Sequence, residues 1–293
     1  MKRESFGSRL GFILVSAGCA IGIGNVWKFP YICGAYGGAA FILIYLCFLV
    51  ILGIPVLVAE FAVGRGSHTS VAKCFDKLAP AGSCWKPLKF IGIIGCYMLM
   101  MFYTTVGGWM IYYCVKSLRG DFVGATPEAV TQSFSDMLGN APTMMLWMVI
   151  ICLIGFAVCF MGLQNGIEKI SKVMMSALLI IMVILAVHSV MMEGAGEGIR
   201  FYLVPDFQKI KEAGVGNVVF AALSQSFFTL SIGIGAMLIF GSYLDKSRSL
   251  TGEAVSITVL DTFVALTAGF IIIPACFSYG IQPDAGPSLI FIT

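Results

Sequence analysis

The sequence predicts an all-α integral membrane protein, and three observations support that fold class. The chain has 293 residues, of which 59% are hydrophobic and only 11% charged, and its mean hydropathy is +0.95. Soluble domains contain roughly 45–50% apolar and about 25% charged residues. The apolar residues lie in long continuous runs, unlike the alternating strands of a transmembrane barrel. Since only helices and closed barrels satisfy every backbone group in lipid, these runs predict membrane-spanning helices.

About seven segments are long enough to span a bilayer, which requires about 20 mainly apolar residues. They are expected near residues 10–33, 39–63, 88–115, 141–162, 173–192, 215–243 and 254–279. The segments between them are mostly short and are polar or rich in glycine. The sequence therefore predicts a multi-pass bundle with short connections.

Two connecting segments also predict short surface helices. In residues 67–80, apolar residues recur at helical spacing with lysines between them, which is typical of an interfacial helix. Residues 201–213 predict a second surface helix. There Asp206 follows Pro205 and can cap a helix start.

Lysine and arginine residues set the expected orientation. If the N-terminus is cytoplasmic, the cytoplasmic segments hold 12 of these residues and the outer loops hold 5. Such a bias marks the cytoplasmic side of a membrane protein. We therefore expect a cytoplasmic N-terminus in the cell membrane, and an odd number of spans puts the C-terminus outside.

Several function classes lack support in the sequence. Most of the ten cysteines lie in apolar runs without a CxxC pair, so they are expected to pack as small apolar residues. No basic block or zinc spacing indicates nucleic acid. No HExxH, GxSxG or P-loop motif occurs, so neither an enzyme nor an organic cofactor is predicted.

Two expected spans are unusually rich in helix-breaking residues. The residues concerned are Gly18, Gly22, Gly24 and Asn25 in the first span and Thr229, Ser231, Gly233 and Gly235 in the sixth. Close packing through small residues would explain either segment alone. Together they favour unwound backbone, which is tolerated in a membrane only where it lines a cavity. Free carbonyls there suit a hard cation, and helix N-termini suit a carboxylate.

Few ionisable residues lie within the spans, and each has an alternative structural interpretation. Glu60 and Lys28 lie near span ends, where long side chains can reach the interface. Asp261 lies deep in the seventh span, where it is a functional candidate or a protonated packing residue. Tyr103 in the third span is a candidate ligand or a packing residue.

Specific motifs in the first and sixth spans resemble those of the neurotransmitter:sodium symporter family. Residues 9–30, RLGFILVSAGCAIGIGNVWKFP, resemble the family's first span, and residues 224–243, SQSFFTLSIGIGAMLIFGSY, resemble its sixth. Residues 37–65, 103–109, 162–172 and 204–209 carry further matches.

The resemblance implies an inverted-repeat transporter fold with discontinuous first and sixth helices. Residues 1–192 would form the first five-helix repeat, and residues 215–293 would begin the second. Seven of an expected eleven or twelve spans would be present in one incomplete domain, so the chain is expected to be part of a longer product.

The resemblance also assigns site residues. The first sodium site would use the Ala20 carbonyl, Asn25, Thr229 and Asp261, and the second would use the Gly18 and Ile21 carbonyls. The amino-acid substrate would meet Gly22, Gly24, Tyr103, Phe228 and Ser231, with Leu99 and Ile234 beside its side chain. Gate or support positions are Arg3, Lys28, Glu60 and Tyr243. Chloride-site equivalents are Tyr45, Gln225, Asp261 and Ala265.

The implied function is sodium-coupled import of an amino acid, with a hydrophobic or aromatic one favoured, by alternating access. Chloride-dependent family members usually carry asparagine and serine where this chain has Asp261 and Ala265. Chloride-independent transport is therefore expected. The exact amino acid, the number of sodium ions, proton counter-transport and the oligomeric state stay open.

Three other classes of membrane protein were weighed. A seven-helix receptor or retinal protein would contradict the orientation and lacks a Schiff-base lysine in the seventh span. A channel would share ion-binding carbonyls but would not need substrate closure. An intramembrane enzyme would need a nucleophile and base pair, which the sequence does not show.

Overall fold

The expected spans are helices in the computed structural model, which describes residues 6–283 and 289–292. In chain order the helices are α1 (Arg9–Ala20), the π-helix η1 (Gly24–Lys28), α2 (Phe29–Ala35), α3 (Ala39–Phe48), the π-helix η2 (Leu49–Gly53), α4 (Ile54–Ser67), α5 (Val71–Leu78), α6 (Leu88–Arg119), α7 (Pro127–Gly139), α8 (Ala141–Phe160), the π-helix η3 (Leu163–Glu168), α9 (Lys169–Val190), α10 (Ala195–Leu203), α11 (Phe207–Ala213), α12 (Val215–Thr229), α13 (Ala236–Gly241), α14 (Leu250–Tyr279) and α15 (Leu289–Ile292).

Five of the predicted spans are continuous helices with the length and apolarity to cross a membrane. They are α3 to α4, α6, α8, η3 to α9, and α14. The first span is a broken pair, because Arg9–Ala20 and Gly24–Ala35 meet at an angle of 50°. The sixth consists of α12 and the short α13, separated by residues 230–235. The discontinuous first and sixth helices are therefore confirmed.

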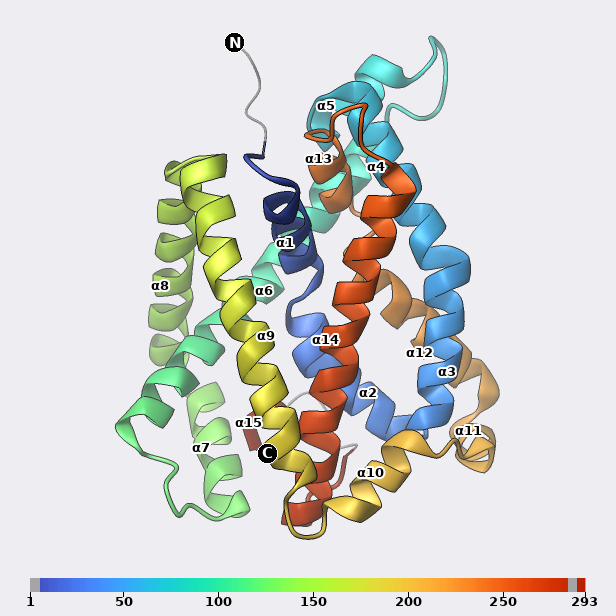
Figure 1. Ribbon diagram of the computed structural model, residues 1–293. Coiled ribbons are helices and arrows are strands. Elements are labelled where there is room, and N and C mark those ends of the chain that lie inside the picture. Colours follow the sequence, from blue (N-terminus) through green and yellow to red (C-terminus); the bar gives the residue numbers. More distant parts are fainter. Residues whose placement is uncertain (1–5, 284–288, 293) are drawn as a thin grey trace.

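The connections between spans lie at the two ends of the bundle. The start of α1, together with α5 and α13, lies at one end, whereas α7, α10 and α11 lie at the other (Figure 1). The start of α1 and α5 belong to segments predicted to be cytoplasmic, and α13 is the end of the predicted sixth span. In contrast, α7, α10 and α11 belong to segments predicted to be outer. The arrangement is the one that alternating traversals of a membrane would produce.

The predicted interfacial helix is α5, whose Val71 and Cys74 are buried. The prediction of one helix over residues 201–213 was wrong, because α10 and α11 are separate. Pro205 disfavours a helical conformation in the preceding Val204, which is extended with φ −99° and ψ 113°. Asp206 caps α11 by accepting a hydrogen bond from the Gln208 N–H at 3.0 Å.

The core lies where α14 crosses α1, α2 and α9, and it extends through α3 to α12. Buried aromatic side chains such as Phe29, Phe41 and Tyr45 fill it. In contrast, α8 has no buried residues and exposes side chains such as Leu153 and Phe156. An apolar helix with this exposure suits contact with lipid, whereas α1, α12 and α14 place the polar site inside.

Candidate functional site: a buried polar cluster beside a cavity

The two broken spans supply irregular backbone in the middle of the bundle. The first break follows Ala20, where Ile21 is extended with ψ 100°. In the sixth, Ser231, Gly233 and Gly235 have φ of 52°, 92° and 80°. These left-handed conformations are favourable only for glycine, so Ser231 adopts a rare backbone geometry.

Side-chain hydrogen bonds connect the two breaks. The Ser231 hydroxyl donates to the Cys19 carbonyl at 3.1 Å, and Gln225 Nε2 donates to the Gly24 carbonyl at 3.1 Å. Glu60, from α4, accepts hydrogen bonds from the N–H groups of Gly233 at 2.6 Å and Leu238 at 3.2 Å. The Ser231 and Glu60 contacts pair backbone groups at the breaks, whereas the Gly24 carbonyl also accepts from the Phe29 N–H within the first span.

A cluster of three buried polar side chains lies next to the first break. Asp261, on α14, accepts from Asn25 Nδ2 at 2.8 Å through one carboxylate oxygen and from the Thr229 hydroxyl at 2.8 Å through the other. All three side chains are fully buried. Ala20, whose carbonyl was the fourth predicted ligand, ends α1 five residues before Asn25. An oxygen-rich cluster in apolar surroundings suits a hard cation.

The predicted substrate residues line one cavity of about 490 Å³. Its walls contain Leu99, Tyr103, Phe228, Ser231 and Ile234. The remaining predicted positions, Gly22 and Gly24, each lie against a residue that lines this cavity. A Cβ at Gly22 would stand 3.7 Å from the Tyr103 ring, and a Cβ at Gly24 would stand 2.9 Å from the Phe228 ring. No side chain larger than hydrogen fits at Gly24 without moving Phe228.

Four further residues line the cavity that the sequence did not single out: Leu223, Ser224, Phe227 and Ile232. They lie in the same sixth span as the predicted residues. Ser224 and Phe227 lie four residues before Phe228 and Ser231, so helical spacing would have predicted them on the same face.

Lys28 and two aromatic rings lie together at the cavity. The Lys28 Nζ stands 4.0 Å from the centre of the Phe228 ring, a distance typical of cation–π contacts. The Tyr103 ring centre lies 6.5 Å from that of Phe228. The charged group predicted for a gate therefore contacts an aromatic ring predicted to meet the substrate.

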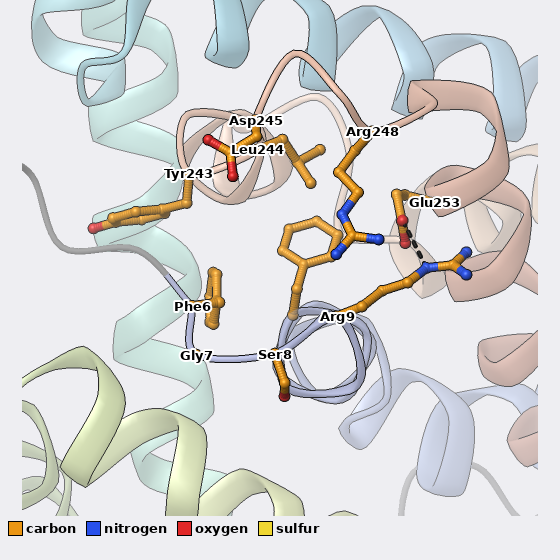
Figure 2. Close-up of a pocket in the computed structure, with 10 residues that line it drawn as sticks. Phe6, Gly7, Ser8, Arg9, Tyr243, Leu244, Asp245, Arg248 and Glu253 are labelled. Atoms are coloured by element: carbon orange, nitrogen blue, oxygen red, sulfur yellow. Dashed lines mark hydrogen bonds and ion pairs between the residues drawn. The ribbon is translucent and has the colours of Figure 1, made fainter.

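The predicted gate residues at the opposite side are only partly described. Arg3 lies outside the described residues. Tyr243 packs edge-on against Phe6, with ring centres 5.6 Å apart. Both line a separate pocket of about 110 Å³, in which Arg9 Nε pairs with Glu253 Oε1 at 2.9 Å (Figure 2).

The other predicted ion positions lie in the core. Tyr45 faces Thr229 and Asp261, and Gln225 and Ala265 are fully buried. In the second predicted sodium site, Gly18 lies against Met175, and Ile21 lies just beyond α1. The chloride-site equivalents and the second sodium site stay predictions.

Comparison with known proteins identifies the family. The model of the sodium:neurotransmitter symporter family matches residues 3–133 and 128–280. An uncharacterised sodium-dependent transporter of Bacillus subtilis, YhdH, is 37% identical over 99% of this chain and 63% of its own length. An uncharacterised sodium-dependent transporter of Haemophilus influenzae is 33% identical over 99% of this chain and 65% of its own length.

Structural similarity agrees with the sequence matches. The crystal structure of MhsT in complex with L-phenylalanine has a TM-score of 0.91 and 38% identity, and the match covers 99% of this chain and 65% of MhsT. The chain thus spans somewhat less than two thirds of the length of these relatives. The matched residues include both broken spans and the buried polar cluster between them, and the chain belongs to the sodium:neurotransmitter symporter family.

Proposed function

We propose that the protein is a sodium-coupled symporter that imports an amino acid by alternating access. The observation that carries this proposal is the position of the Asp261 cluster. Asn25 lies just after Gly22 and Gly24, which lie against the cavity residues Tyr103 and Phe228. Thr229 lies between Phe228 and Ser231, which line the cavity. A cation held by the cluster and a ligand in the cavity would therefore share one stretch of backbone.

The cavity favours an amino acid with an apolar side chain. In this proposal the substrate carboxylate would meet the Gly22 and Gly24 backbone and the Tyr103 hydroxyl, and its ammonium group would meet carbonyls near Phe228 and Ser231. Leu99, Ile234 and Phe227 add apolar walls. The MhsT structure contains L-phenylalanine, which is consistent with a hydrophobic or aromatic substrate.

Ligands from a shared stretch of backbone would couple sodium binding to amino-acid binding. If sodium orders Asn25 and Thr229, the neighbouring backbone is already arranged for the amino acid, so each solute raises the affinity for the other by the same factor. A second sodium ion would bind the Gly18 and Ile21 carbonyls. The first repeat would be residues 1–192 and the second would begin at residue 215. The N-terminus would face the cytoplasm, with Arg3 and Tyr243 in the inner gate.

The proposal includes chloride-independent transport. Asp261 supplies a carboxylate inside the cluster itself, in a site where unpaired charge is costly. Ala265, fully buried one turn later, has no hydroxyl with which to hold an anion. The fixed carboxylate would balance the sodium charge in place of a bound chloride.

The test is binding of a panel of radiolabelled amino acids to the complete protein, including any sequence beyond residue 293, at varied sodium concentration. Phenylalanine or another apolar amino acid should bind with sodium and not with potassium. A channel would bind sodium with an affinity that does not change when amino acid is added. Sodium-independent binding across the panel would overturn the proposal.

A further inference from the structure

A buried carboxylate outside the substrate cavity lies at the end of the bundle where α1 begins. Glu168 ends η3 and is only 3% exposed. Its oxygens accept hydrogen bonds from the Gly7 N–H at 2.8 Å, the Ser8 hydroxyl at 3.3 Å and Lys172 Nζ at 2.7 Å. Two of these three donors belong to the segment that leads into α1.

The first turn of α1 rests directly on this carboxylate. A Cβ at Gly11 would overlap the Glu168 carboxyl group, so any larger residue there would force the Glu168 side chain to move. Ser8 also caps α1, because its hydroxyl accepts from the Gly11 N–H at 2.9 Å. The Glu168 side chain therefore contacts both the segment that leads into α1 and the first turn of α1.

The same segment has a second ionic contact. Arg9 pairs with Glu253, whose side chain is 3% exposed, whereas the Arg9 side chain is 52% exposed and is screened by water. Glu168 is also buried, but it accepts hydrogen bonds from two groups of this segment. Hydrogen bonds to a charged group are roughly twice as strong as neutral ones. Without the Gly7 and Ser8 donors, the buried Glu168 carboxylate would lack two of its hydrogen-bond partners, which costs free energy.

The shape of the first span allows α1 to move as a separate unit. It has 12 residues and is joined through Ile21 to the rest of the span, which lies at an angle of 50°. Asn25 and the buried cluster lie beyond that joint. A displacement of α1 would open the end of the bundle without dismantling the Asn25 contacts with Asp261.

We infer that Glu168 is a positioning residue that holds α1 closed at this end, and that losing its bonds to Gly7 and Ser8 accompanies opening toward this side. The inference deepens the proposed transport function and rests on it. Residues 6–9 form one side of the pocket in Figure 2, and Tyr243 and Leu244 form the other. Leu244 is 4% exposed, and it would become accessible when this segment leaves.

Two single variants and their combination test the inference. Glu168→Gln removes the charge but keeps the size of the side chain. Ser8→Asp keeps a helix-capping oxygen, since aspartate is a good N-cap, but places a second negative charge against Glu168. Ser8 is exposed, so this variant tests the contact even if Glu168→Gln does not fold.

The readout is maleimide labelling of Leu244→Cys in the complete protein, with the other cysteines replaced. Each single variant should raise the labelling rate about tenfold. In the double variant the combined effect should fall well below the product, because the contact that both changes disrupt can be lost only once. Two native cysteines, each restored singly in the same background, serve as controls: the exposed Cys84 and the fully buried Cys33 near the opposite end. Neither should change its rate.

Unchanged Leu244→Cys labelling in the variants that fold would overturn the inference. So would multiplicative effects in the double variant, or faster Cys33 labelling, which would indicate general loosening of the bundle. Because labelling needs neither sodium nor amino acid, its outcome is independent of the panel test. Failure of the panel with the labelling pattern intact would refute only the proposed transport activity.

Discussion

Asp261→Asn tests the role of the buried carboxylate in sodium binding. The substitution keeps the size of the side chain and one oxygen, but it removes the negative charge of the carboxylate. The two carboxylate oxygens accept hydrogen bonds from Asn25 and Thr229, each at 2.8 Å. Two unit charges about 4 Å apart interact by about 4 kcal/mol at an effective dielectric constant of 20. The remaining amide dipole and the lower desolvation cost offset part of this. A net loss of about 2 kcal/mol corresponds to roughly thirtyfold weaker sodium binding.

The assay is sodium-dependent binding and uptake of radiolabelled phenylalanine by the complete protein, in chloride and in gluconate. The unmodified protein should give equal uptake in both media. Asp261→Asn should impair chloride-free uptake, and adding Ala265→Ser should restore part of it in chloride only. Ala265→Ser alone is the matched control. Collapse of the unmodified protein's uptake in gluconate, or an unchanged sodium affinity in Asp261→Asn, would refute the reasoning.

Three further predictions concern other parts of the molecule. Asn25→Ala should severely weaken sodium-driven uptake because an oxygen ligand is lost; normal expression with unchanged sodium dependence would contradict this. Tyr202→Phe should lower the free energy of unfolding by about 1 kcal/mol, measured in thermal melts, because the buried hydroxyl donates to the Leu266 carbonyl at 2.9 Å. Liposomes containing only residues 1–293 should show no sodium-dependent accumulation, because these residues span less than two thirds of the matched relatives; robust uptake would show that they suffice.

Much of the fold follows from the sequence because membrane spans are constrained by length and apolarity. The glycines near Asn25 and Thr229 also marked both breaks correctly, since glycine allows the backbone conformations found at Gly233 and Gly235. The candidate site residues around those breaks were assigned by the resemblance of the two spans to the symporter family. Asp261 was found as a rare charge deep in an apolar run.

Other features depend on contacts between distant segments and could not be predicted. The sequence did not single out Glu168, and only the fold shows that it is buried against Gly7, 161 positions away in sequence. The prediction of one helix in residues 201–213 gave too little weight to Pro205. A missed local signal lies at α7, where Thr126 caps the helix by accepting from the Ala129 N–H.

The most direct test of the proposed function is accumulation of phenylalanine by proteoliposomes that contain the complete protein. An inward sodium gradient should drive uptake above the external concentration, and abolishing the gradient at constant sodium should reduce it to equilibration. Asn25→Ala should severely weaken the accumulation and leave the vesicles intact. Equal accumulation with and without the sodium gradient would contradict sodium-coupled symport.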